Sequence, residues 1–204
     1  MLCRIKVCGI TERENALSLS ALRIDALGFI FAKESSRYIE PDKAGGIIDA
    51  LPPFVKTVGV FVNASCREIE EVKRKAGFDV CQLHGDESPE YIKALKMPVI
   101  KSFSSDENLK KGTVMSYASA SGILLDASKG SMRGGTGEKC NWEKAHEIGG
   151  YGLNTILAGG LSETNVKEAV QKVRPYAVDL NSGVEDSPGI KNIGRVKSVI
   201  DLIS

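Results

Sequence analysis

The chain has 204 residues, of which 42% are hydrophobic and 26% are charged, and its formal net charge is +1. This composition is typical of a globular protein and excludes a disordered chain, and the near-zero charge argues against a dedicated nucleic-acid binder. No apolar run approaches the roughly 20 residues that a membrane helix needs, and the N-terminus lacks the features of a signal peptide. We therefore expect a cytoplasmic protein that binds neither nucleic acid nor membranes.

The chain contains five cysteines and two histidines. No pair of cysteines forms a C-x-x-C motif, so neither a disulfide framework nor a zinc knuckle is expected. The scarcity of histidine argues against a zinc hydrolase and against a Ser-His-Asp triad. If the protein is an enzyme, we expect no metal site and expect its proton transfers to use Cys, Asp, Glu or Lys.

Short apolar runs rich in Val and Ile recur along the chain, and each is followed by a turn signal and then a helical pattern. The predicted strands lie at residues 3–9, 25–32, 55–62, 78–85, 98–103, 121–128, 154–160 and 176–183. Between them, Thr11 with Glu14 and Ser65 with Glu68 have the spacing of a capping box at a helix N-terminus. The last helix is predicted near residues 190–203.

Eight strand-and-helix units of about 25 residues each predict a parallel sheet whose faces are covered by helices. Closing such a sheet on itself gives an α/β fold, a single (β/α)8 TIM barrel, which we expect to span residues 1–204 as one domain. The alternative is an open, doubly wound sheet, which often carries a glycine fingerprint after its first strand. Here the first strand ends in CGIT, at residues 8–11, so the barrel is favoured.

In a barrel of this kind the active site lies where the strands end, and side-chain alternation selects the residues that face the interior. Cys8 ends the first strand on the same face as Arg4 and Lys6, which suggests either a site residue or a small buried hydrophobe. Asp126 follows two leucines, where a carboxylate is costly unless it is solvated, paired or neutral. It is therefore either a site residue or a cap for the next loop.

Polar residues also end or follow other strands. Gln82 and His84 share one face of the fourth strand and suit hydrogen bonding to substrate hydroxyls, or form a structural pair. Arg37 follows the second strand and is either a bidentate clamp for a carboxylate or a solvated side chain. His146 is predicted to lie on a helix surface.

Glycines lie at the ends of the seventh and eighth predicted strands, at the positions where barrels of this class bind phosphate. Gly159 and Gly160 end the seventh strand, and Ser182 and Gly183 end the eighth. Glycine lets the backbone approach an anion closely, although it also forms ordinary turns. The glycine-rich segment 130–137 follows the sixth strand and is predicted to be a lid or a substrate loop.

A set of short motifs in register resembles the phosphoribosylanthranilate isomerase family, a barrel of tryptophan biosynthesis. The motifs are KVCGIT (6–11), GFIFAKESSRYI (28–39), VGVFVN (58–63), QLHG (82–85), LLD (124–126), GGTG (134–137) with a following Trp142, AGGL (158–161) and VDLNSGVE (178–185). The resemblance spans essentially the whole chain. Each motif is weak by itself, but eight in the family's order are highly specific.

The resemblance implies an isomerase that converts N-(5-phosphoribosyl)anthranilate into 1-(2-carboxyphenylamino)-1-deoxyribulose 5-phosphate by an Amadori rearrangement, without a cofactor. Matching positions make Cys8 the general base, Asp126 the general acid and Arg37 the group that holds the anthranilate carboxylate. The matching phosphate loops contain Gly159, Gly160, Ser182 and Gly183. We expect burial to keep Asp126 protonated and Lys6 to favour the thiolate of Cys8.

Gln82, His84 and Asp179 are further candidate contacts to this small phosphorylated substrate. Two other functions stay open at this point: the related aminoaldose–ketose isomerase of histidine biosynthesis, and a non-catalytic barrel that binds a phosphorylated ligand. The histidine enzyme uses an aspartate on the first strand where this chain has Cys8. A thiol-redox role for that cysteine is a weaker idea, since no resolving partner is present. The sequence is compatible with a monomer or a homodimer.

Overall fold

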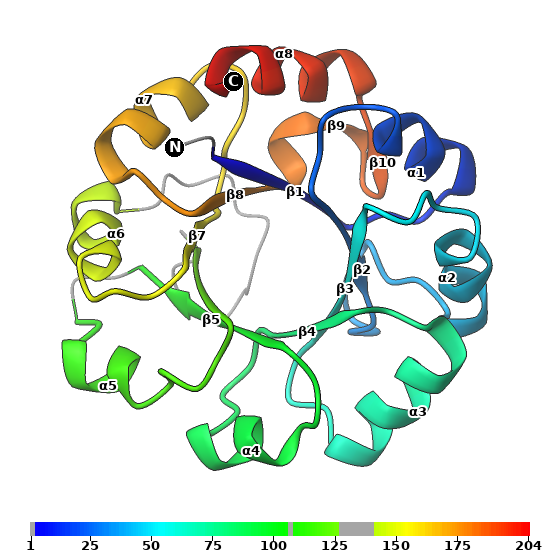
Figure 1. The fold of residues 1–204 in the computed structure, drawn as a ribbon. Coiled ribbons are helices and arrows are strands. Elements are labelled where there is room, and N and C mark those ends of the chain that lie inside the picture. The colour runs from blue at the N-terminus through cyan, green and yellow to red at the C-terminus, as the bar shows by residue number, and fades with distance from the viewer. Residues whose placement is uncertain (1–2, 106–107, 127–140) are drawn as a thin grey trace.

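The protein forms a closed barrel of eight parallel strands in the order β1 to β8, with helices around the outside (Figure 1). The computed structural model describes residues 3–105, 108–126 and 141–204. The strands are β1 (Arg4–Cys8), β2 (Ala26–Ile30), β3 (Lys56–Phe61), β4 (Val80–Leu83), β5 (Val99–Ser104), β6 (Gly122–Asp126), β7 (Thr155–Leu157) and β8 (Ala177–Leu180). The predicted (β/α)8 barrel is confirmed, and each strand lies within or close to its predicted range.

Helices connect successive strands and cover the outer face of the barrel. They are α1 (Arg13–Ser20), α2 (Pro41–Ile48), α3 (Cys66–Ala76), α4 (Pro89–Ala94), α5 (Lys111–Met115), α6 (Trp142–Gly149), α7 (Val166–Val173) and α8 (Ile193–Ile203). The capping box of Ser65 and Glu68 is confirmed at the start of α3. The one predicted for Thr11 is wrong, because its hydroxyl donates to the Gly189 carbonyl and α1 has no side-chain cap.

The chain departs from the simple repeat after β8. A short 3-10 helix, η1 (Ser182–Val184), leads into an antiparallel hairpin of β9 (Glu185–Ser187) and β10 (Ile190–Lys191) before α8 begins. The helix predicted from residue 190 therefore begins three residues later. The turn between the two strands requires Gly189, whose φ is +89°. This hairpin brings Lys191 back to the end of β1.

Alternation along the strands separates two apolar cores. Ile5, Val7 and the other outward-facing residues pack against the helices in the larger cluster. A smaller cluster fills the barrel interior and contains Val58, Ile100, Leu124, Ile156, Ala158 and Ala177. Toward the carboxyl ends of the strands the interior becomes polar, which places the candidate site there. No helix in the described part of the chain is both long and apolar enough to cross a membrane.

Candidate active site

The interior at the end of β1 contains a buried ion pair beneath Cys8. Lys6 donates to both carboxylate oxygens of Asp179 on β8, each at 2.9 Å, because the two residues are register partners on neighbouring strands. Burial alone would lower the pKa of Lys6, but the Asp179 carboxylate raises it above its ordinary value. Lys6 is therefore an ammonium group, and the two oxygens of the predicted substrate contact Asp179 already have a partner.

Cys8 is fully buried next to these charges. Burial raises the pKa of its thiol above the ordinary value, although the ammonium groups of Lys6 and Lys191 oppose that change. The expected effect of Lys6 on Cys8 has the right direction but is too small to outweigh burial. In the unliganded protein at neutral pH, Cys8 is thus a thiol, and the thiolate is a minor form.

Asp126 and His84 face each other across the interior. Asp126 ends β6, is buried, and has one oxygen 3.7 Å from Nε2 of His84. Burial lowers the pKa of His84 to about 4, so the ring is neutral at pH 7. Its Nδ1 lies 3.3 Å from the amide nitrogen of Gln82, and the amide oxygen of Gln82 is buried without a partner among the described residues.

These groups lie close enough to one another at the mouth of the barrel to interact electrostatically. The carboxylate of Asp179 acts on the thiol of Cys8 and on His84, and Asp126, when it is ionised, raises the pKa of Asp179. The structure therefore places the predicted base and acid around the carboxylate of Asp179, and it places His84, which follows β4, next to the acid and in contact with Gln82. His146 is exposed on α6, as predicted.

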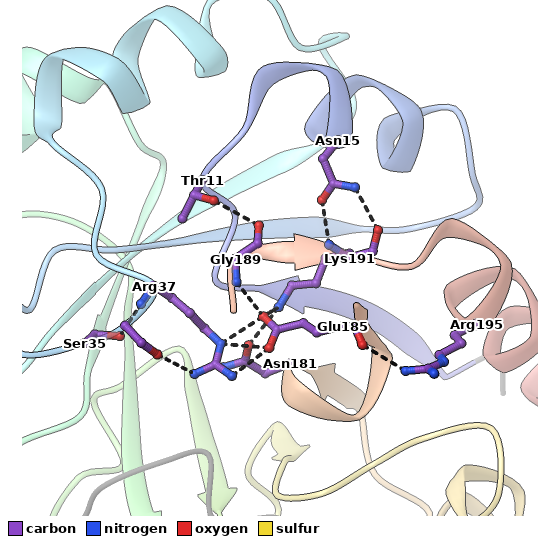
Figure 2. Close-up of polar contacts among 10 residues, drawn as sticks. Thr11, Asn15, Ser35, Arg37, Asn181, Glu185, Gly189, Lys191 and Arg195 are labelled. Atoms are coloured by element: carbon purple, nitrogen blue, oxygen red, sulfur yellow. Dashed lines mark hydrogen bonds and ion pairs between the residues drawn. The ribbon is translucent and has the colours of Figure 1, made fainter. Parts of the chain in front are cut away.

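Arg37 lies at the same end of the barrel, in the loop after β2, and is half-buried. Its Nε and Nη2 atoms form a bidentate ion pair with Glu185 at the start of β9, with contacts of 2.6 to 3.1 Å (Figure 2). Lys191 of β10 donates to the same carboxylate at 2.5 Å and to Oδ1 of Asn181 at 2.8 Å. Burial lowers the pKa of Lys191, and Glu185 offsets part of that change.

Glu185 and Lys191 were not predicted as site residues. Glu185 is the last letter of the VDLNSGVE motif, but the partner that reveals its role lies 148 positions away. Lys191 was assigned to a helix. The Pro188–Gly189 dipeptide was a usable signal, because it is typical of a tight turn between two strands.

The loops after β7 and β8 lie against each other. Gly159 and Gly160 both have a positive φ, of +90° and +64°. A side chain at Gly183 would place its Cβ only 2.1 Å from the Leu161 carbonyl oxygen, so that glycine is needed for close approach of the two loops. Ser182 begins η1 beside this contact. All four predicted phosphate-binding residues thus lie in one pair of touching loops.

The predicted lid at 130–137 lies outside the described residues, so its placement stays a prediction. Among the described residues, no group of three or more His, Cys, Asp or Glu side chains is arranged to hold a metal ion.

Comparison with known proteins identifies the family. The model of the N-(5'-phosphoribosyl)anthranilate (PRA) isomerase family matches residues 5–202. An N-(5'-phosphoribosyl)anthranilate isomerase from Trichlorobacter lovleyi is 45% identical over 197 residues, which are 97% of this chain and 96% of the relative.

Solved structures agree with the sequence match. The phosphoribosyl anthranilate isomerase from Thermus thermophilus is 40% identical, with a TM-score of 0.89 over 98% of this chain and 97% of that one. A second such isomerase is in complex with reduced 1-(o-carboxyphenylamino)-1-deoxyribulose 5-phosphate and is 36% identical, with a TM-score of 0.86 over 99% and 98% of the two chains. The chain therefore belongs to the N-(5'-phosphoribosyl)anthranilate isomerase family.

Proposed function

We propose that the barrel mouth carries out this family's Amadori rearrangement with Cys8 as general base and Asp126 as general acid. As a member of the family, the chain is an aldose–ketose isomerase of tryptophan biosynthesis. The observation that supports the two roles is the position of both groups at the carboxyl ends of inward-facing strands. There a thiol and a carboxyl group come from strands β1 and β6, with the buried charges of Lys6 and Asp179 between them.

The first step opens the sugar ring. Asp126 donates a proton to the ring oxygen, the bond between that oxygen and C1 breaks, and the anthranilate nitrogen lone pair forms an iminium ion with C1. The positive charge makes the proton on C2 acidic. Neutral His84 lies 3.7 Å from Asp126, and with a pKa of about 4 it is not an acid at pH 7.

The second step removes the C2 proton. The thiolate of Cys8 takes it, C1 and C2 form a double bond, and the iminium electrons return to nitrogen. The resulting enolamine tautomerises to the ketone, and exchange with solvent returns the proton from Cys8 and reprotonates Asp126. Lys6 and Lys191 stabilise the thiolate, and the neighbouring iminium cation adds to that effect.

The remaining binding roles follow the same geometry. Arg37 binds the anthranilate carboxylate, the loops with Gly159, Gly160, Ser182 and Gly183 bind the phosphate, and Gln82 and His84 hydrogen-bond to the sugar hydroxyls. Asp179 acts on the substrate through Lys6 and Cys8. Both monomer and homodimer stay open for this chain, and the solved enzyme from Thermotoga maritima is described as dimeric and in a monomeric form.

Steady-state assays of the wild type, Cys8→Ala and Asp126→Asn test the two catalytic roles. A general acid or base contributes about 10²–10⁴-fold, so each variant should lose turnover by about that factor while it keeps its circular dichroism spectrum. Because burial raises the pKa of Cys8, kcat/KM of the wild type should still be rising above neutral pH. A folded Cys8→Ala enzyme with normal turnover would contradict the base, and an unchanged pH–rate profile in Asp126→Asn would contradict the acid.

A further inference from the structure

The carboxylate of Glu185 is held by two cations from different parts of the chain. Arg37 contacts it with Nε and Nη2, and Lys191 contacts Oε1, while the backbone N–H of Gly189 donates to it at 3.1 Å. The side chains of Lys191 and Glu185 are 0% and 5% exposed, whereas that of Arg37 is 14% exposed. Arg37 is therefore the member of this cluster that reaches the open mouth. We call these three residues the arginine clamp.

The ion pair with Glu185 uses one edge of the Arg37 guanidinium group, and a second edge is not part of that pair. Glu185 occupies the side edge formed by Nε and Nη2. Among the described residues, the end edge, formed by Nη1 and the second hydrogen of Nη2, makes one long contact, in which Nη1 donates to the hydroxyl of the exposed Ser36 at 3.4 Å. Guanidinium binds carboxylates bidentately through either edge. The end edge is thus positioned to take a second carboxylate.

The charges of the arginine clamp do not cancel. Glu185 alone would neutralise Arg37 and remove its attraction for an anion. Lys191 adds a second positive charge, and a carboxylate 2.5 Å from its amine favours the ammonium form. The cluster therefore has a net charge of +1, which matches one incoming carboxylate.

The arginine clamp also lies directly beside the end of β1. Gly9 follows Cys8, and a Cβ at that position would lie 2.7 Å from Cδ of Arg37, 3.0 Å from Oδ1 of Asn181 and 3.4 Å from Nζ of Lys191. Because Gly9 lies close to the side chains of Arg37 and Lys191, a carboxylate bound to Arg37 would lie near the proposed base.

We propose that Glu185 and Lys191 are positioning residues that prepare Arg37 to select the aromatic carboxylate of the substrate. Glu185 fixes the side edge of the guanidinium so that the end edge faces the mouth, and Lys191 restores the positive charge that Glu185 would otherwise cancel. This inference rests on the proposed function of the mouth and adds to it the groups that determine carboxylate recognition.

Calorimetric titration with two matched probes tests it without turnover. The first probe is reduced 1-(o-carboxyphenylamino)-1-deoxyribulose 5-phosphate, and the second is the same compound with phenyl in place of carboxyphenyl. The ratio of their dissociation constants measures recognition of the carboxylate alone. A variant that merely folds less well lowers the fraction of binding sites and leaves this ratio unchanged.

We expect Lys191→Met to reduce the carboxylate preference by about tenfold, because the arginine clamp then has no net charge. The double variant Lys191→Met/Glu185→Gln has a net charge of +1 again and removes both buried partners together. The carboxylate preference of the double variant should exceed that of Lys191→Met, because the positive charge is restored. It should stay below that of the wild type, because the glutamine amide at position 185 holds Arg37 less firmly than the carboxylate does. A residue needed only for packing would not be rescued by a second substitution in the same cluster.

Lys56→Met provides the control, because it removes the same charge from an exposed lysine at the amino end of β3 and should leave the ratio unchanged. A wild-type ratio in Lys191→Met would overturn the inference about Lys191. A double variant no better than Lys191→Met would overturn the charge argument. Failure of the wild type to bind either probe would instead count against the proposed function, so the two failures are distinguishable.

Discussion

Three buried carboxylate–lysine pairs lie at the carboxyl end of this barrel, and the two that join Glu87 to Lys101 and Glu185 to Lys191 are built differently. Glu87 and Lys101 are each 2% exposed and lie 2.9 Å apart. The carboxylate also accepts hydrogen bonds from the backbone amides of Asn63 and Gly85, and Lys101 donates to the Gly85 carbonyl. Glu185 and Lys191 are equally buried, but their carboxylate has a second cation in Arg37.

The difference between these two ion pairs distinguishes one that only stabilises the fold from one that is suited to binding an anionic ligand. Lys101 points outward from β5 toward the rings of Phe103 and Tyr117, and its charge is cancelled by Glu87. A buried pair of this kind is satisfied internally and has nothing left to offer a ligand. In the arginine clamp one positive charge is left over, and the end edge of the guanidinium makes only the long contact with Ser36 among the described residues. Charge balance, more than burial, therefore distinguishes the two.

The largest expected effect on the free energy of unfolding comes from replacing the lysine of each pair by methionine. Lys101→Met leaves Glu87 buried with no counterion, and it should lower the free energy of unfolding by about 3–5 kcal/mol. Lys191→Met should cost less, about 1–2 kcal/mol, because Glu185 keeps its bidentate bond to Arg37. Urea denaturation of both variants measures the difference.

Removing both charges provides the control for that experiment. Lys101→Met/Glu87→Gln should recover part of the lost stability, because no buried charge is left uncompensated. The carboxylate preference in the calorimetric titration should stay at the wild-type value wherever the variant folds. If Lys101→Met and Lys191→Met lower the free energy of unfolding equally, Arg37 does not compensate the charge of Glu185 when Lys191 is removed. That result would contradict the proposed difference between the two pairs.

The sequence was sufficient for the barrel and for the inward-facing residues of its strands. Alternation along β1 placed Lys6 and Cys8 on the interior face, and Asp126 lies at the carboxyl end of β6, two residues before the predicted end of that strand. These predictions worked because each depends on a period of two residues within one strand and on the rule that barrel sites lie at strand ends. The family motifs then supplied roles that position alone left open.

The ion pairs could not be predicted in this way. Arg37 and Glu185 are 148 residues apart, and Lys6 and Asp179 are 173 apart, because closing the barrel joins β1 to β8. Periodicity reports which face a residue occupies, but not which residue lies across from it. Lys101 shows the same limit, because a lysine on the outward face of a strand gives no sign that a carboxylate is buried beside it.

A medium effect is expected from His84, which belongs to the mouth but is neutral. The unfolded chain protonates this histidine near pH 6.5, whereas burial lowers its pKa to about 4 in the folded protein. Because the unfolded state binds the proton more readily, stability is complete above about pH 7 and declines as the pH falls toward 4. Between about pH 7.5 and pH 5, protonation of His84 alone should lower the free energy of unfolding by about 2 kcal/mol.

Urea denaturation at those two pH values, with the wild type and His84→Gln, measures that contribution. The variant should lose less stability on acidification than the wild type. The chain offers a matched control in its second histidine, since His146 is exposed on α6. His146→Gln should keep the wild-type pH dependence. If the two variants behave alike, His84 is not held neutral by burial, and its proposed role as a neutral hydrogen-bonding group is wrong.

The smallest effect is expected from an exposed pair of the same chemical type. Lys56 and Asp79 lie 3.5 Å apart with side chains that are 69% and 41% exposed. Asp79 also accepts hydrogen bonds from the amide and hydroxyl of Thr57, at 2.9 and 3.1 Å, so it keeps partners when the lysine is removed.

Lys56→Met should therefore change the free energy of unfolding by less than about 1 kcal/mol, and added salt should reduce the change further. Urea denaturation at low and high ionic strength measures both. The three lysine-to-methionine variants then form a series in which the loss in free energy of unfolding depends on the partners that the carboxylate keeps. Glu87 keeps backbone amides alone, Glu185 keeps a guanidinium group, and Asp79 keeps solvent and Thr57. If Lys56→Met lowers the free energy of unfolding as much as Lys191→Met does, this order is wrong. Solvent and Thr57 would then compensate Asp79 no better than Arg37 compensates Glu185.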